Sequence, residues 1–581
     1  MLLKKGANGP WRKSRISVAD GLKISIIMML PVVSALATSE AQMDKKNLFL
    51  AALLAFLLCT RAMPLFRGPI VNIESLDTIA LINSLALGHY VLYTESLVQV
   101  WLILVPYHLL GGALSVLDIV YVMNALIALI SGILVYVSAN TIAQSRSAGL
   151  LSVLLLALYP MAIYAQAFGS WTGDIISPVF LVMAVISLIF SIQNKERTRR
   201  FAWAALSLAA LYFSYASWSA GIYAAVSYIF VLIALVLMRL FKNLKLSLFI
   251  IIALVSVAYL IYIPSPHNIG IFTSGNDYRG DIINNTINLV SGTSYALYGN
   301  GVPNTNFIGA LSASPLYLMF VLECGFLSTL LIAVTSWAFL GKKARFTHVQ
   351  EQAYLSMMVL YIIAVPIALT YSRFVSLLIL PIAILAGSAI GAIHAESVPK
   401  TWRIAIAIIL LSVLFVDALQ ISTAMYAAQL RSGWRSATIW AAVNTPPNST
   451  FLTDPTDEQP MQLYGNRQSY LDGWNDSLWT GAPFTHSVAR FYDFLFQPEC
   501  NFTYFRTHHP TYLVLNYWLG NSGYILPNRS VNGTNLAYLL DTTQNLACSG
   551  IGMEMVYNHN QTKIFKVVDC PSATVWNIRR C

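Results

Sequence analysis

Long apolar stretches dominate the first 430 residues of the chain. A helix that crosses a bilayer needs about 20 mainly apolar residues. The stretches that we predict to be transmembrane helices lie near residues 47–63, 119–142, 149–166, 175–193, 201–216, 218–238, 246–264, 316–340, 352–371, 374–393 and 404–423. Two weaker runs, 24–39 and 98–116, are shorter or interrupted by Pro and Gly, and we do not count them as crossings. The pattern therefore predicts a polytopic α-helical membrane domain over residues 1–429.

The first weak run also has features of a signal peptide, because a basic flank precedes its apolar residues and Ala-Leu-Ala follows them. Cleavage there would leave the first predicted span starting outside the membrane, whereas the distribution of basic residues described below requires it to start in the cytoplasm. We therefore interpret residues 24–39 as an interfacial or re-entrant segment.

The pattern changes after residue 430, where long apolar windows end and short strand-like runs such as 511–518 and 562–568 begin. Four of the six cysteines lie here, which favours disulfides in an oxidising exterior, with three possible pairings. Sequons of the form Asn-x-Ser/Thr start at Asn284, Asn448, Asn475, Asn501, Asn528, Asn532 and Asn560, and none falls in a predicted inner loop. Because a sequon is a short pattern, chance in an Asn-rich region is an equal explanation. We predict a mixed α/β extracytoplasmic domain over residues 430–581.

Composition agrees with a membrane protein. The 581 residues are 57% hydrophobic and 10% charged, whereas soluble domains carry about 25% charged residues. The net charge of +10 does not indicate nucleic acid, because residues 430–581 hold ten Lys/Arg and ten Asp/Glu, so the excess lies in the apolar part. With eleven crossings from an inside start, the inner segments hold 21 Lys/Arg and the outer loops four: Arg61, Arg67, Arg279 and Arg373. The positive-inside rule then places the N-terminus in the cytoplasm and residues 430–581 outside the cell membrane.

Two outer aspartates are the candidate metal ligands. Asp77 follows the first span, and Asp174 lies just before the span near 175–193. Two carboxylates from separate loops suit a Mn²⁺ or Mg²⁺ ion that also binds phosphate and water. The alternative is that Asp174 only caps the helix that follows it.

Arg373 is the candidate phosphate-binding residue, because it opens the span near 374–393 at the predicted outer face. Its planar guanidinium could hold an anionic phosphate group. Alternatively, it could extend to lipid headgroups, as arginines at helix ends commonly do.

Several segments, in consistent order along nearly the whole chain, resemble the catalytic subunits of oligosaccharyltransferases, which belong to the type-C glycosyltransferases. Residues 148–174 look like the family's third span and second outer loop, which ends in a catalytic Asp, here Asp174. Residues 61–77 look like its first outer loop and place the other catalytic Asp at Asp77. The remaining similar segments are 201–223, 372–391 with Arg373, 434–447, 465–474 and 553–568.

This sequence also departs from the family. In the family, the catalytic Asp is followed two residues later by another acid, and Ile176 takes that position here. The family's Trp-Trp-Asp-Tyr-Gly acceptor motif is replaced by Asp-Pro-Thr-Asp-Glu at 454–458. The position of its loop Glu is taken by Ser314, and the family has two more spans. The acceptor-binding residues and the third metal ligand therefore stay unassigned.

The resemblance implies transfer of a glycan from a polyprenyl (dolichyl) phosphate or diphosphate to the Asn of a sequon in an extracytoplasmic protein. Asp77 and Asp174 would bind Mn²⁺ or Mg²⁺, and Arg373 would bind the donor diphosphate. One alternative is a related type-C glycosyltransferase that uses a polyprenyl-phosphate sugar on an acceptor without a sequon. A transporter or flippase is a second alternative, but it would place polar residues at mid-membrane and repeat its spans.

Overall fold

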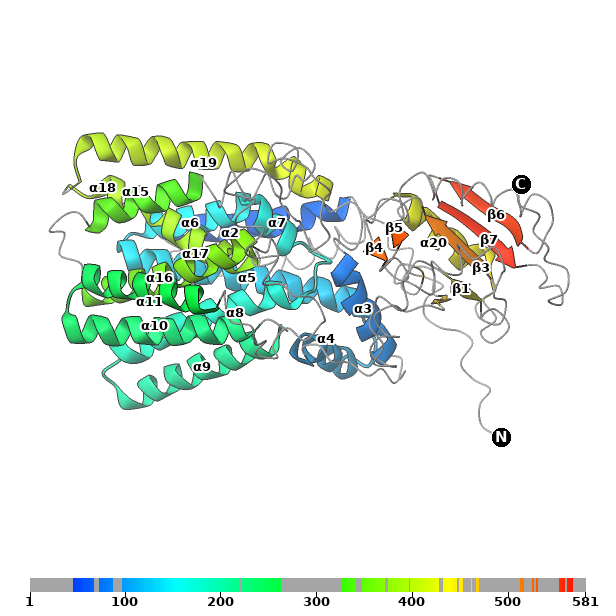
Figure 1. The fold of residues 1–581 in the computed structure, drawn as a ribbon, viewed down its shortest axis with the longest axis horizontal. Helices are drawn as coiled ribbons and strands as arrows, with labels where there is room; N and C mark the ends of the chain where they lie inside the picture. The colour runs from blue at the N-terminus through cyan, green and yellow to red at the C-terminus, as the bar shows by residue number, and fades with distance from the viewer. Residues whose placement is uncertain are drawn as a thin grey trace.

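The computed structural model describes the chain in separate stretches. These are residues 45–66, 73–86, 97–218, 221–262, 327–340, 347–370, 375–396, 398–427, 432–446, 449–452, 461, 467–469, 512–516, 525–526, 529–530, 553–559 and 562–567. Figure 1 shows two parts, a long helical bundle and a smaller part with a β-sheet.

Every apolar window that we counted as a crossing contains a helix. The helices of the bundle are α2 (Lys45–Ala62), α3 (Ile73–Ala86), α4 (Leu97–Leu109), α5 (Val116–Ala143), α6 (Arg146–Leu158), α7 (Pro160–Ala165), α8 (Gly173–Gln193), α9 (Arg197–Ala216), α10 (Ile222–Phe241), α11 (Leu244–Tyr262), α15 (Ser328–Leu340), α16 (His348–Thr370), α17 (Ser376–Gly387), α18 (Ala389–His394) and α19 (Lys400–Ala427), with a 3₁₀ turn, η2 (Met63–Phe66). Within the described residues, six units are long and apolar enough to cross a membrane: α2, α5, α8, α10, α17 with α18, and α19. A polytopic helical membrane domain is thus confirmed, while the number of eleven crossings stays a prediction.

Two of the predicted windows are each divided into two helices, and one of the two weak runs forms a short helix. Pro160 has no backbone N–H and cannot continue α6, so the window near 149–166 divides into α6 and α7. The window near 374–393 divides at Ser388 into α17 and α18. The weak run 98–116 forms the short helix α4, and Gly111 and Gly112 adopt positive φ of 58° and 73° just beyond it. Residues 24–39 lie outside the described residues.

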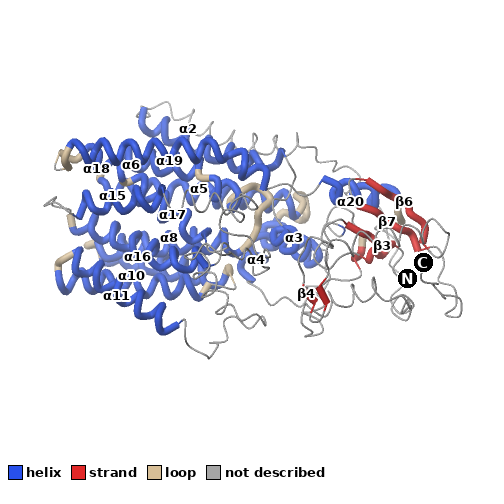
Figure 2. The backbone as a smooth tube through the Cα atoms, turned by 45° about the horizontal axis from the view of Figure 1, so that its top comes forward, coloured by secondary structure: helices blue, strands red, loops and turns tan. Residues whose placement is uncertain are grey.

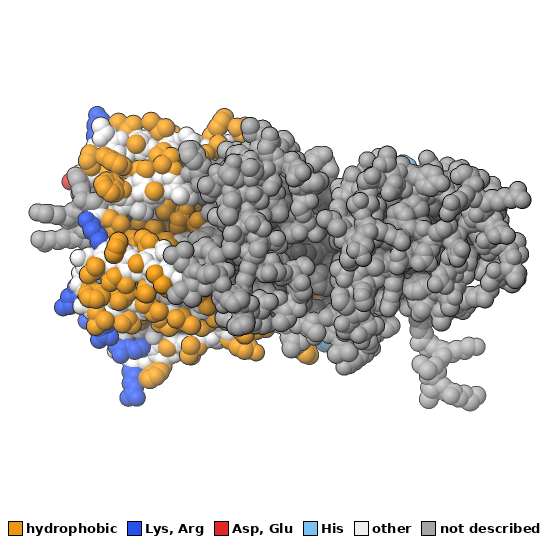
Figure 3. Space-filling view, in the orientation of Figure 1, with side chains coloured by type: hydrophobic (Ala, Val, Ile, Leu, Met, Phe, Trp, Pro, Cys, Tyr) orange, Lys and Arg blue, Asp and Glu red, His pale blue; other side chains and the backbone are white. Residues whose placement is uncertain are grey.

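The core of the bundle is centred on α17, all twelve residues of which are buried. Glycines let neighbouring helices approach it closely: a Cβ on Gly387 would collide with the Ser152 side chain of α6. On the outside, α19 exposes Ile404, Ile408, Leu411, Phe415 and Leu419 at helical spacing. Figure 3 shows a largely apolar surface on this side of the bundle, which suits contact with lipid.

Basic side chains gather at the end of the bundle that lies farther from the sheet (Figure 3). They occupy the helix ends and the short connections there. The exposed ones that the structure describes are Arg146, Lys195, Arg197, Arg199, Arg200, Arg239, Lys242, Lys245 and Lys400.

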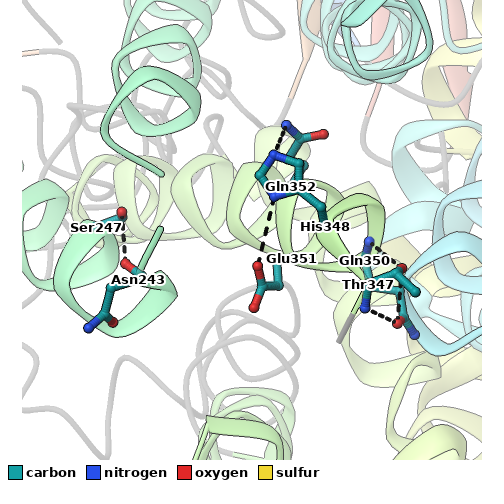
Figure 4. Close-up of polar contacts among 7 residues, drawn as sticks. All are labelled: Asn243, Ser247, Thr347, His348, Gln350, Glu351 and Gln352. Atoms are coloured by element: carbon teal, nitrogen blue, oxygen red, sulfur yellow. Dashed lines mark hydrogen bonds and ion pairs between the residues drawn. The ribbon is translucent and has the colours of Figure 1, made fainter. Parts of the chain in front are cut away.

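The same end is held together by side chains that cap helix termini. Thr347 and Gln350 form a reciprocal cap at the start of α16, because each backbone N–H donates to the other's side chain, at 2.8 and 3.4 Å (Figure 4). Gln350 also donates to the Ile142 carbonyl at 3.1 Å, near the end of α5. Gln144, in the left-handed region with φ 47°, donates to the Thr347 hydroxyl at 3.3 Å. The start of α16 is therefore hydrogen-bonded to the end of α5.

The second part contains α20 (Ser432–Asn444) and the strands β1 (Thr450–Leu452), β2 (Gln468–Ser469), β3 (Tyr512–Asn516), β4 (Ile525–Leu526), β5 (Arg529–Ser530), β6 (Met553–His559) and β7 (Thr562–Val567). Five strands form one sheet in the order β2-β1-β3-β7-β6, with β1 parallel to β2 and β3 and the other pairs antiparallel. Figure 2 shows β3, β7 and β6 of this sheet. Arg467 caps the end of α20 by donating to Ala442 and Thr445 carbonyls. The two strand-like runs coincide with β3 and β7. The predicted boundary near residue 430, the four cysteines after it and every sequon asparagine lie outside the described residues.

Candidate functional site

Asp174 lies in the first turn of α8. The N-cap residue is Thr172, so Asp174 is the second helical residue and not the capping residue. Its side chain is half-buried, and Oδ1 is buried without a hydrogen-bond partner. An unpaired carboxylate oxygen is unusual in a folded protein, where buried polar atoms nearly always have a partner. A hard oxygen donor in this state suits a Mg²⁺ or Mn²⁺ ion.

The connection that leads to Asp174, residues 166–172, is held by side chains of the surrounding helices. Asn124 of α5 donates to the carbonyls of Ala167 and Ser170, at 2.8 and 2.9 Å. The indole of Trp171, which is only 1% exposed, donates to the Gln99 carbonyl of α4 at 3.0 Å. With its polar groups paired inside the protein, this connection can hold Asp174 in one place.

The start of α3 contacts the same connection. The Trp171 backbone N–H donates to the Ser75 hydroxyl at 2.8 Å, and the hydroxyls of Ser75 and Ser170 lie 3.5 Å apart. Asp77 follows Ser75 by two residues in α3, although its side chain lies outside the described residues. Figures 1 and 2 both place α3 and α4 at the bundle end nearer to the sheet. The backbone segments that carry the two candidate aspartates are therefore joined by a direct hydrogen bond.

Replacing Ser75 by Ala should weaken this junction, because the buried Trp171 N–H would lose its acceptor. Leaving a buried donor unpaired costs about 1–3 kcal/mol. We expect a lower thermal unfolding midpoint, measured in detergent, together with a reduced rate in any reaction that needs both aspartates. Ser412 in α19 is the matched control, since its hydroxyl only bonds within its own helix on an exposed face, and Ser412→Ala should change neither quantity. Equal effects of the two substitutions would contradict a special role for Ser75.

The remaining candidates are not placed. Arg373 lies outside the described residues, between the end of α16 at Thr370 and Val375. Ser314 and residues 454–458 also lie outside them. Among the described residues, no group of three or more metal-binding side chains occurs. Of the two proposed metal ligands, the structure describes the side chain of Asp174 and not that of Asp77.

The sequence reasoning missed the polar residues that support Asp174. Ser75, Gln99 and Asn124 come from three helices that contact the connection through side-chain or backbone atoms. The one signal available for Asn124 was its amide inside the apolar window 119–142, since buried amides need partners. Ser75 and Gln99 carried no signal of this kind.

No protein-family model matches the chain, and no curated protein matches it in sequence. Solved structures do match. The archaeal oligosaccharyltransferase AglB from Archaeoglobus fulgidus, in complex with an inhibitory peptide and a dolichol-phosphate, aligns with 82% of this chain and 70% of its own at a TM-score of 0.52 and 14% identity. The same enzyme tethered to an acceptor peptide with an NVT sequon aligns at 0.50, with 12% identity over 80% of this chain and 69% of its own. ArnT from Cupriavidus metallidurans in the apo state aligns with 90% of this chain and 97% of its own at 0.51 and 14% identity.

AglB and ArnT are both type-C glycosyltransferases. This chain shares its fold with both enzymes. At 12–14% identity the likeness concerns the fold alone, and it does not separate an oligosaccharyltransferase from an ArnT-like enzyme. The shared fold agrees with the coarser part of the prediction, a polytopic membrane protein built like these enzymes, and leaves activity, metal use and the acceptor to be tested.

Proposed function

We propose that this protein transfers a glycan from a polyprenyl (dolichyl) phosphate or diphosphate to the asparagine of Asn-x-Ser/Thr sequences in extracytoplasmic proteins. The observation that carries the proposal is the hydrogen bond between Trp171 and Ser75. It joins the segments of Asp77 and Asp174 in a chain that shares its fold with AglB and ArnT.

The distribution of charge supports an extracytoplasmic site. The exposed basic residues gather at the bundle end opposite the sheet, whereas α3 lies at the end nearer to it (Figures 1 and 3). The connection to Asp174 is hydrogen-bonded to α3 through Trp171 and Ser75. Cytoplasmic segments of membrane proteins carry the excess of Lys and Arg. The basic end therefore faces the cytoplasm in our proposal, and the aspartates and residues 430–581 lie outside.

The reaction needs the donor's sugar–phosphate bond to break at the outer membrane surface. Mn²⁺ or Mg²⁺ held by Asp77 and Asp174 would supply positive charge to the departing phosphate group. Arg373 would orient that group, because its fork of N–H donors matches phosphate oxygens in pairs. The acceptor amide would approach the sugar from the side opposite the phosphate. The energy of the reaction comes from the phosphate linkage itself, so no nucleotide site is required.

A second function, transfer of a polyprenyl-linked sugar to an acceptor without a sequon, is favoured by one comparison. The alignment takes in 97% of ArnT and 70% of AglB, so the likeness extends over nearly the whole of ArnT. The Asp-Pro-Thr-Asp-Glu sequence at 454–458, in place of the Trp-rich motif, points in the same direction.

One assay separates the two functions. The purified protein is given a polyprenyl-diphosphate glycan, Mn²⁺ and a peptide that contains Asn-x-Thr, and a matched peptide with Gln in place of Asn is the control. We expect glycosylated product from the first peptide alone. Glycan consumption without product on either peptide would contradict sequon transfer and favour another acceptor.

A further inference from the structure

Arg61, in the last turn of α2, is a fully buried cation. Its guanidinium has an exposed fraction of 0%, and none of the acids that the structure describes forms an ion pair with it. Its acceptors are neutral: the Leu156 carbonyl at 2.6 Å from Nη2, the Thr60 hydroxyl at 3.2 Å from Nη1, and the Gln166 side chain at 3.5 Å from Nε. Burying a charge without a carboxylate partner is costly, so a buried arginine in a membrane helix invites a functional explanation.

The carbonyls that Arg61 contacts are those that the break at Pro160 leaves free. In a continuous helix, the N–H of residue 160 would donate to the Leu156 carbonyl, but proline has no N–H. Arg61 supplies this donor from another helix, and Nη1 also points to the Ala157 carbonyl at 3.5 Å. The end of a helix carries partial negative charge, which compensates a buried cation. Arg61 therefore closes the end of α6 and joins it to α2.

The same residue also holds the start of the connection that leads to Asp174. The Phe168 N–H donates to the Arg61 carbonyl at 3.0 Å. Gln166, which accepts from Arg61 Nε, donates in turn to the Ser131 hydroxyl of α5 at 3.2 Å. The Arg61 side chain thus holds the break between α6 and α7. Its side chain and its backbone carbonyl together hold residues 166–168.

We propose that Arg61 is a positioning residue that sets the path of the connection to Asp174, without touching the donor itself. This inference rests on the proposed function, in which Asp174 is a metal ligand. A lysine keeps the charge but has one point donor in place of the planar fork, so it cannot reach Leu156 and Gln166 together. Arg61→Lys should therefore loosen the connection and misplace Asp174.

The test measures three quantities in purified wild-type and Arg61→Lys protein. The Mn²⁺ concentration for half-maximal transfer should rise at least tenfold, the KM for the lipid-linked donor should stay within twofold, and amide hydrogen exchange over residues 166–173 should become at least tenfold faster. Gln350→Ala is the matched control, because Gln350 also closes a helix end from a neighbouring helix but at the opposite end of the bundle. It should leave the Mn²⁺ dependence and this exchange unchanged, even if it lowers the unfolding midpoint.

The outcomes distinguish this inference from the proposed function. Wild-type Mn²⁺ dependence and wild-type exchange in Arg61→Lys would overturn the positioning role. If Arg61→Lys does not fold, Gln166→Met carries the same readouts: it removes the acceptor of Nε without changing charge, and unchanged values would overturn the proposal. If the wild-type protein transfers no glycan, the proposed function fails, whereas the exchange comparison still decides whether Arg61 holds the connection.

Discussion

Replacing Asp174 by Asn should abolish glycan transfer while leaving the protein folded. The substitution preserves the size of the side chain but removes the negative charge of a carboxylate whose Oδ1 is buried and unpartnered. A metal ion contributes several kcal/mol of charge stabilisation in such reactions, and each 1.36 kcal/mol is a factor of ten in rate. We expect a loss of about 10³-fold or more in turnover, measured with a fluorescent sequon peptide, at an unchanged unfolding midpoint.

The matched control for this experiment is Asp118→Asn. Asp118 is also a first-turn aspartate with a buried, unpartnered Oδ1, in α5, but its Oδ2 accepts from the Ser115 backbone and hydroxyl at 3.1 and 2.6 Å in a capping box. Asn can still accept one of these bonds, so turnover should stay near the wild-type value. Wild-type turnover in Asp174→Asn would contradict its role as a metal ligand, and so would equal losses in both variants.

Replacing Arg373 by Ala should weaken use of the donor far more than use of the acceptor. The guanidinium would hold the phosphate group of the donor in paired, charge-assisted hydrogen bonds, and removing one such stabilising group costs about 10²–10³-fold. We expect kcat/KM for the lipid-linked donor to fall by about 10²-fold, while KM for the acceptor stays within a few-fold. The measurement is steady-state kinetics with each substrate varied in turn.

Arg239→Ala serves as the control for Arg373, because Arg239 is an exposed arginine in the last turn of α10, at the basic end of the bundle. It should leave both kinetic parameters unchanged. Unchanged donor kinetics in Arg373→Ala would remove this residue from the site and favour the interpretation that it contacts lipid headgroups.

The bundle could be predicted from the sequence because its signal is local. A run of about 20 apolar residues predicts a membrane helix without reference to its neighbours. Each of the eleven windows contains a helix, and the strand-like runs near 511 and 562 became β3 and β7. The end of α4 was also foreseeable from Gly111 and Gly112, whereas Pro106 lies inside the helix and does not end it.

The contacts that organise the candidate site could not be predicted in the same way. Ser75 and Trp171 are 96 positions apart, and Arg61 and Leu156 are 95 apart. Hydrophobic periodicity carries no information about such pairs. Arg61 shows the consequence: the sequence placed it among four outer-loop cations, whereas the structure places it inside the protein at the end of α6. Its buried position could have been suspected only by connecting it with the free carbonyl that Pro160 creates.

The claim that Asp77 and Asp174 bind one shared ion is tested most directly by Mn²⁺ binding, measured by electron paramagnetic resonance on the purified wild-type protein, Asp77→Ala, Asp174→Ala and the double variant. For a shared ion, each single variant should lose most of the bound Mn²⁺, and the double variant should lose little more, because residues that act as one unit are not additive. Wild-type Mn²⁺ affinity in either single variant would contradict the account.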